Sequence, residues 1–251
     1  MIRGVLLDLS GVLYVGDKLL PGALSAVQRL VDAGLPVRYI TNTTRSTRQM
    51  ILQRLTRLGF NIAAEDIFTA PIASRQYIEA NSLVPFLLIH PDLEPEFIGM
   101  IGEPNAVLVG DAGDRFTYNN MNLAFRYLQD GAPLLAMGVN RYFSEGDMLS
   151  LDAGPFVHAL EYACGSKAVV LGKPSFEFYA TAVNSLGCNP EETVMVGDDV
   201  EADVIGAMCA GLNGILVQTG KFIQGDEKKI KAGAVCVADI TAAVDYILEQ
   251  I

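Results

Sequence analysis

The chain has 251 residues, 51% of them hydrophobic, so it is long enough to bury a large core in one or two domains. Its formal net charge of −11 disfavours nucleic acid and anionic membranes as partners, although it leaves room for a small phosphate bound beside a cation. Asp8 interrupts the first apolar run before it resembles a signal peptide, no run reaches the roughly 18 residues of a membrane span, and the four cysteines form no CxxC pair, so we expect a cytoplasmic protein.

Short apolar strands and amphipathic helices alternate along almost the whole chain. The predicted strands cover residues 5–7, 37–40, 86–89, 106–109, 133–137, 193–196 and 214–217. The predicted helices lie near residues 23–33, 48–58, 70–80, 117–129, 154–164, 175–186, 201–210 and 241–250. This alternation is typical of a parallel sheet covered by helices. We therefore predict an α/β protein with a doubly wound, Rossmann-like parallel sheet.

Four polar motifs stand at or near the ends of predicted strands. In chain order they are Asp8-Leu9-Ser10-Gly11, Thr41-Asn42, Gly172-Lys173-Pro174, and Gly197-Asp198-Asp199 with Asp203. In an open parallel sheet, the carboxyl ends of the strands border one crevice, where ligands bind. The motifs are therefore expected to converge there.

Their residue types suit phosphoryl transfer. Asp8 can attack phosphorus, since carboxylates act as nucleophiles through aspartyl-phosphate intermediates. Asp8 and Asp198 together can hold a hard divalent ion such as Mg²⁺. Asp203 is either a further metal ligand or a cap on the following helix. Thr41 can hold phosphate oxygens or cap a turn, and Lys173 can balance the charge of phosphate and carboxylates.

A short sequence pattern that occurs twice offers two candidates for the metal ligand. Val107-Leu108-Val109-Gly110-Asp111 resembles Val194-Met195-Val196-Gly197-Asp198, and both read as a strand followed by a Gly-Asp turn. Only the second is followed by more carboxylates, at Asp199 and Asp203. We therefore predict the metal site at Asp198 and not at Asp111.

The four motifs, in this order, resemble those of the haloacid dehalogenase superfamily of phosphatases over essentially the whole chain. Pro21-Gly22-Ala23, Ile40-Thr41-Asn42 and Gly172-Lys173-Pro174 resemble the branch that contains the nucleotide-monophosphate and pyridoxal phosphatases. This resemblance implies a catalytic core at residues 1–79 and 169–251 and an inserted α/β cap at residues 80–168. It also implies Mg²⁺ as cofactor, a small phosphorylated substrate, and a homodimer formed through the cap.

The same resemblance implies a role for each motif residue. Asp8 would be the nucleophile, and Ser10 would supply its carbonyl to a metal also held by Asp8, Asp198 and Asp203. Phosphate would be held by Thr41, Asn42, Thr43 and Lys173. Within the branch, Asp8 to Tyr14, Ala159 to Gly165 and Gly172 to Ser175 are similar to the phospholysine phosphohistidine inorganic pyrophosphate phosphatases, and Thr41 to Thr44 is closer to their hydrolase-domain-containing relatives.

Ser10 departs from the usual pattern of the superfamily, which has an acid/base Asp two residues after the nucleophile. Losing such a group typically lowers the rate by ~10²–10⁴. The loss matters less for leaving groups that need little protonation, which favours pyrophosphate, phosphohistidine and phospholysine over alkyl phosphates. What activates water in the second step is left open, with Asp199 as one option.

The sequence is also compatible with two alternatives. Ser10 is also compatible with a protein that binds phosphate or a partner without turnover. Carbon–halogen or C–P hydrolysis is disfavoured, because dehalogenases need no metal and residues 80–166 contain no lysine for a Schiff base.

Overall fold

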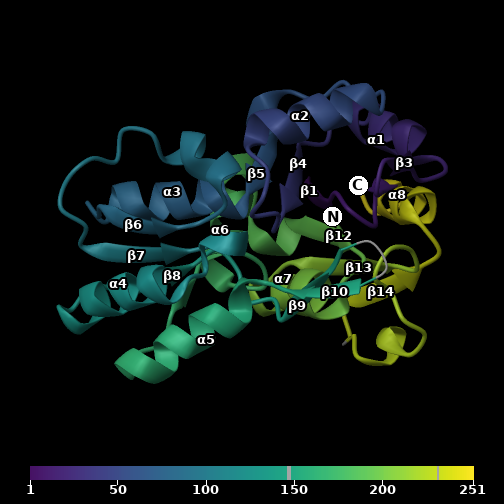
Figure 1. Cartoon of the computed structure of the whole chain (residues 1–251). Coiled ribbons are helices and arrows are strands. Elements are labelled where there is room, and N and C mark those ends of the chain that lie inside the picture. The colour runs from purple at the N-terminus through teal and green to yellow at the C-terminus, as the bar shows by residue number, and fades with distance from the viewer. Residues whose placement is uncertain (146–147, 231) are drawn as a thin grey trace. The chain divides into compact units, whose positions relative to one another are not determined.

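The computed structural model describes residues 1–145, 148–230 and 232–251 (Figure 1). The chain divides into two compact units. The first comprises Met1–Thr41, Arg48–Phe68 and Lys173–Ile251, and the second comprises Asn42–Thr47 and Thr69–Gly172. The long segment of the second unit therefore runs from Thr69 to Gly172, whereas the cap predicted from the sequence runs from residue 80 to residue 168. The helix at residues 70–80 belongs to the second unit, because its buried side chains join that unit's apolar core.

The first unit is built on a six-stranded sheet. Its strands, in spatial order, are β14 (Ala234–Val237), β13 (Asn213–Val217), β12 (Thr193–Gly197), β1 (Gly4–Asp8), β4 (Val37–Thr41) and β5 (Ile67–Thr69). β1 pairs in parallel with both β4 and β12, and Leu7 lies opposite Tyr39 and Val196. The chain runs outward from β1 to β5 and later returns through β12 to β14. The strand order therefore reverses between β1 and β12, where α/β sheets bind ligands.

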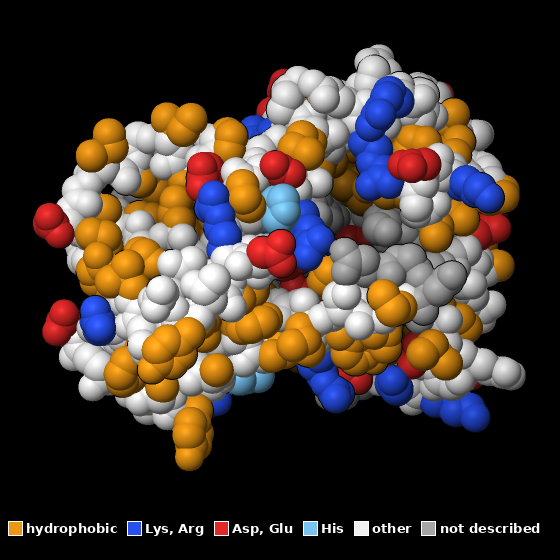
Figure 2. Space-filling model, in the orientation of Figure 1, with side chains coloured by type: hydrophobic (Ala, Val, Ile, Leu, Met, Phe, Trp, Pro, Cys, Tyr) orange, Lys and Arg blue, Asp and Glu red, His pale blue; other side chains and the backbone are white. Residues whose placement is uncertain are grey.

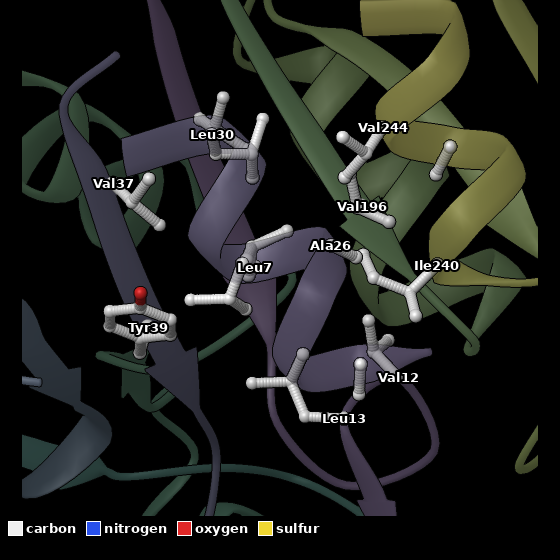
Figure 3. Close-up of a cluster of buried hydrophobic side chains, with 14 of the residues drawn as sticks. Leu7, Val12, Leu13, Ala26, Leu30, Val37, Tyr39, Val196, Ile240 and Val244 are labelled. Carbon is white, nitrogen blue, oxygen red and sulfur yellow. The ribbon is translucent and has the colours of Figure 1, made fainter. Parts of the chain in front are cut away.

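Helices and a short hairpin complete this unit. They are the hairpin β2 (Tyr14–Val15) and β3 (Lys18–Leu19), the helices α1 (Ala23–Asp32), α2 (Arg48–Arg57), α6 (Phe176–Leu186), α7 (Gly206–Cys209) and α8 (Ile240–Leu248), a π-helical segment (Val200–Ile205), and 3₁₀ turns at Ala64–Asp66, Pro190–Glu192 and Asp226–Lys228. Figure 3 shows Leu7 and Val196 of the sheet packed with Ala26 and Leu30 of α1 and Val244 of α8. Successive side chains of a strand point to opposite faces of the sheet, so the residues next to Leu7 and Val196 in β1 and β12 point to the opposite face.

The second unit contains its own four-stranded parallel sheet. In spatial order the strands are β11 (Val169–Val170), β8 (Leu134–Ala136), β7 (Ala106–Val109) and β6 (Pro85–Leu88). The other elements are α3 (Ala70–Ala80), α4 (Tyr118–Gln129), α5 (Ala153–Cys164), the hairpin β9 (Tyr142–Glu145) and β10 (Met148–Leu151), and 3₁₀ turns at Pro91–Phe97 and Gly113–Arg115. Leu108 packs into one apolar cluster, with α3, while Val107 and Val109 pack into another, with α4 and α5. Thr69, Thr117 and Asp152 cap the three helices through side-chain oxygens.

The predicted α/β class and parallel sheet are confirmed, and the predicted strands and most predicted helices are present with small shifts at their ends. The exception is the helix predicted at 201–210, where a π-helical segment (Val200–Ile205) precedes the four-residue helix α7 (Gly206–Cys209). Seven strands were not predicted, because each has only two to four residues and shows little periodicity: β2, β3, β5, β9, β10, β11 and β14. On the face shown in Figure 2, acidic and basic side chains are interspersed with hydrophobic ones. Among the described residues, no helix is both long and apolar enough to cross a membrane.

Candidate active site

Two carboxylates lie at the point where the strand order of the first unit reverses. Asp8 is the last residue of β1, and Asp198 directly follows the neighbouring β12. Asp203 is buried in the π-helical segment that comes next. One carboxylate oxygen from each of the three lies within 4.8 Å of the other two, and no second acidic group of this kind occurs in the described part of the chain. The fold thus brings together three residues that the sequence analysis assigned to the metal.

Lys173 joins this acidic cluster from the start of the segment that leads into α6. Its side chain is only 4% exposed, and its Nζ donates hydrogen bonds to Oδ1 of Asp8 and, at 2.7 Å, to Oδ1 of Asp203. Burial disfavours the charged amine, but Asp203 and Asp8 outweigh that effect and raise the pKa of Lys173 above its usual range. Lys173 is therefore protonated at neutral pH, and its ammonium group bridges the carboxylates of Asp8 and Asp203.

The cluster carries more negative than positive charge. Burial raises the pKa of Asp8 to about 7, against the opposing effect of Lys173 and with a further increase from Asp203 and Asp198. Burial is also the main reason that the pKa of Asp198 rises to about 6. Three buried carboxylates face one buried ammonium group, and a divalent cation would relieve this imbalance. Because Mg²⁺ prefers carboxylate oxygens, the donor set fits it, with Asp8, Asp198 and Asp203 as the residues that would hold it.

A turn after β13 fixes Asp198 and the loop that follows Asp8. The Lys221 amide donates to Oδ2 of Asp198 at 2.6 Å, and the Thr219 hydroxyl donates to the Gly11 carbonyl. Gly11 has φ +93°, and a Cβ at this residue would lie 1.9 Å from Oδ2 of Asp198, so only glycine fits. This turn was not predicted from the sequence. Its available signal was Thr-Gly-Lys shortly after the predicted strand at 214–217.

The remaining predicted site residues occupy different places. Thr41 is buried at the end of β4, on the same edge of the sheet as Asp8. Ser10 is exposed and forms an isolated bridge with Tyr14. Asn42 and Thr43 belong to the second unit. Their contacts with phosphate, and the metal role of the Ser10 carbonyl, stay predictions.

Asp199 caps the π-helical segment. Its Oδ1 accepts hydrogen bonds from the amides of Glu201 and Ala202, and its Oδ2 lies 3.3 Å from Nζ of Lys221. Although burial tends to raise the pKa of Asp199, the bond from Ala202 and the charge of Lys221 lower it overall. Asp199 is therefore ionised, and its position is explained by capping.

Asp111, which takes the place of Asp198 in the other copy of the repeated pattern, lies in the second unit and has different partners. It is buried after β7, forms an ion pair with Nε of Arg45, and accepts a hydrogen bond from the Gly113 amide. The Arg45 guanidinium also lies 4.6 Å from the centre of the Phe143 ring. Since an arginine neutralises Asp111, this residue resembles a structural anchor and not a metal ligand.

Comparisons with known proteins match this chain to two family profiles, in two separate blocks. A family profile described as haloacid dehalogenase-like hydrolase matches residues 5–101, and one described as HAD-hydrolase-like matches residues 170–243. The chain is 45% identical to haloacid dehalogenase-like hydrolase domain-containing protein 2 of Bos taurus, covering 100% of this chain and 97% of that protein. It is 44% identical to phospholysine phosphohistidine inorganic pyrophosphate phosphatase of Danio rerio, with 98% and 94% covered. The crystal structure of 4-nitrophenylphosphatase from Thermotoga maritima superposes with a TM-score of 0.89 at 24% identity over 97% of each chain, a likeness of fold.

Proposed function

Because the chain belongs to the haloacid dehalogenase-like hydrolases and is a phosphatase of that family, we propose that it is a Mg²⁺-dependent enzyme in which Asp8 carries the phosphoryl group. Asp8, Asp198, Asp203 and the Ser10 carbonyl would serve the metal. Mg²⁺, when bound, supplies positive charge that orients phosphate oxygens and offsets the buried carboxylates. The observation that carries the proposal is the position of Asp8, buried at the sheet edge within reach of Lys173 and two further carboxylates.

The reaction divides into two displacements at phosphorus. In the first, an Asp8 carboxylate oxygen forms a bond to phosphorus as the bond to the leaving group breaks, and the leaving group takes the electron pair. In the second, water attacks the acyl phosphate, which releases inorganic phosphate and regenerates Asp8. Lys173 stays protonated, holds Asp8 in place and offsets the negative charge of the phosphoryl group.

Ser10 determines which leaving groups are favoured. An alkoxide from an alkyl phosphate must be protonated as it leaves, and a serine side chain cannot serve as a carboxylic acid. Phosphate leaving from pyrophosphate needs less help, and a phosphoramidate nitrogen can take its proton from solvent before the P–N bond breaks. We therefore assign this chain to labile donors, namely pyrophosphate, phosphohistidine and phospholysine. The name of the 44% identical relative from Danio rerio supports this substrate class.

The first experiment measures phosphate release, with Mg²⁺, from those three donors and from a simple alkyl phosphate. Asp8→Asn is the matched control, because the amide keeps the shape of the side chain and removes the nucleophilic carboxylate. Release from the labile donors that disappears in the control and on chelation is the expected result. Equal or faster turnover of the alkyl phosphate would contradict the assignment to labile donors. If no donor released phosphate, the proposed enzyme activity would be wrong, and the chain would instead be a phosphate-binding protein of the same fold.

A second experiment tests Ser10 directly. Ser10→Asp supplies the missing acid, so turnover of alkyl phosphates should rise by ~10²-fold or more. Turnover of pyrophosphate should change much less, since its leaving group needs little protonation. Ser10→Ala is the control, and it should leave the ratio of the two activities unchanged. If Ser10→Asp raised both activities equally, the argument from leaving groups would be wrong.

Several finer assignments belong to the same proposal. Thr41, Asn42 and Thr43 would hold phosphate oxygens. Residues 80–168 would form a cap domain that selects the substrate, and residues 1–79 and 169–251 would form the catalytic core. The homodimer and the cytoplasmic location are carried over from the resemblance and the composition, and size-exclusion chromatography with light scattering tests the former.

A further inference from the structure

The hairpin β2–β3 is bonded directly to the loop that follows Asp8. The Gly11 amide donates to the Tyr14 carbonyl at 2.7 Å, and Ser10 forms a bridge with Tyr14. Tyr14 is also the first residue of β2. A hairpin with two residues in each strand is marginal by itself, so its position depends on other parts of the fold.

Arg54, on α2, contacts this hairpin at three points. Its Nη2 donates to the Gly16 carbonyl at 2.6 Å and to Oδ1 of Asp17 at 2.9 Å. Its guanidinium carbon lies 4.8 Å from the centre of the Tyr14 ring, in the geometry of a cation–π interaction. α2 itself is fixed, because its Ile51 and Leu55 belong to the core of the first unit.

The same side chain leaves a buried donor unpaired. Nε of Arg54 has no hydrogen-bond partner, the single such buried side-chain nitrogen or oxygen in the parts of the chain that the structure describes. Unsatisfied buried donors are rare in native proteins, because they lose hydration without gaining a partner. An apolar side chain of similar length would avoid this loss. The arginine is therefore explained better by its contacts with the hairpin than by packing.

From these contacts we infer that Arg54 is a positioning residue for the reaction, acting through Tyr14. It holds the turn and the aromatic ring of the hairpin, and the Tyr14 backbone in turn holds Ser10 and Gly11. This loop directly follows Asp8, and its Gly11 packs against Asp198. A shift of the loop would therefore displace both Asp8 and Asp198. The inference rests on the proposed function. In that proposal residue 10 has no carboxylate and contributes its backbone carbonyl, so the position of the Ser10 backbone matters for the reaction.

The test compares Arg54→Met with Arg57→Met, a matched control because Arg57 is exposed one turn further along α2. Asp17→Asn is a second control, since asparagine keeps an oxygen that can accept the bond from Arg54 and removes only the charge of a side chain that is 93% exposed. Each variant is examined by NMR-detected exchange of backbone amides and by steady-state kinetics with pyrophosphate and Mg²⁺.

In Arg54→Met, the Gly11 amide should exchange at least about tenfold faster, while amides of β12 keep their protection. Its kcat should fall by about tenfold or more, with KM within about twofold of wild type. Both controls should match wild type in both measurements. Unchanged exchange at Gly11, unchanged kcat, or equally faster exchange throughout β12 would each overturn the inference, the last because it would indicate general loosening.

Arg54→Lys keeps the inference testable if the methionine variant does not fold. Lysine retains the charge but loses the planar fork, so it should shift exchange and kcat in the same direction by a smaller factor. A lysine variant identical to wild type in both would overturn the inference. If wild type releases no phosphate, the proposed function fails, whereas the exchange measurement still decides whether Arg54 positions the loop.

Discussion

Gly11→Ala is the substitution that most directly tests the geometry of the acidic cluster. A Cβ at residue 11 would lie 1.9 Å from Oδ2 and 2.4 Å from Cγ of Asp198, whereas ordinary contact begins at 3.4 Å. The carboxylate would have to move by about 1.5 Å, the difference between 3.4 and 1.9. Asp198 cannot move freely, because it is buried and its Oδ2 is held by the Lys221 amide.

A displacement of this size predicts a large kinetic effect. Misplacing a reacting group by about 1 Å can lower a rate by ~10²-fold, which corresponds to about 2.7 kcal/mol of transition-state stabilisation. The substitution also places alanine at φ +93°, which costs about 1–2 kcal/mol of folding free energy. Gly34→Ala separates the two effects, because Gly34 has φ +73° but a Cβ there would meet nothing within 4 Å.

The assay is urea unfolding together with phosphate release from pyrophosphate under saturating Mg²⁺. Both variants should lose folding stability, and only Gly11→Ala should also lose ~10²-fold in kcat per folded molecule. A Gly11→Ala protein whose kcat lies within about threefold of Gly34→Ala would refute the reasoning, since Asp198 would then tolerate the added methyl group.

Three further outcomes follow from the same structure. Lys173→Met leaves Asp8 and Asp203 buried without their shared cation, so urea unfolding in EDTA should show a loss of about 3–5 kcal/mol in folding free energy. An unchanged folding free energy would contradict the burial of these ion pairs. Mg²⁺ at about 100 times its Kd should stabilise the wild type by about 2.7 kcal/mol in thermal unfolding. Asp198→Asn should reduce this increment, and an undiminished increment would place the metal elsewhere. Burial opposes the ionisation of Glu161, yet hydrogen bonds to its carboxylate lower its pKa from 4.5 to about 2. Because the folded pKa lies below the unfolded one, this stabilisation is complete above about pH 4.5 and is lost as the pH falls towards 2; Glu161→Gln should flatten that part of the pH–stability curve.

Local patterns in the sequence were sufficient for most of the fold. Residues 5–7 and 194–196 of the two central strands are continuous apolar runs, as expected for strands buried on both faces, and each run is followed by a carboxylate turn. The helices begin at capping residues such as Ser175 and Asp239, whose oxygens bond the free amides of the first turn. Very short strands escaped prediction, because two to four residues held by their neighbours have no periodicity of their own.

Local sequence patterns also predicted part of the candidate site. Asp8, Lys173 and Asp198 stand beside strand ends or a helix start, where the type of residue and the turn chemistry carry the signal. The Thr219–Lys221 turn and Arg54 were not predictable in this way. Their roles depend on which backbone atoms they reach across the fold, at Gly11, Asp198 and Gly16.

The sequence by itself determined the alternation of strands and helices, the parallel sheet and the four motifs, because each depends on residues close together in the chain. Only the tertiary structure decided that Asp203 shares Lys173 with Asp8, that Asp111 pairs with Arg45, and that residues 70–80 belong to the second unit. These outcomes depend on distances between segments far apart in the chain. The physical reason is that burial and charge act through space, so the partner of a buried carboxylate such as Asp111 or Asp203 depends on which cation the fold places beside it.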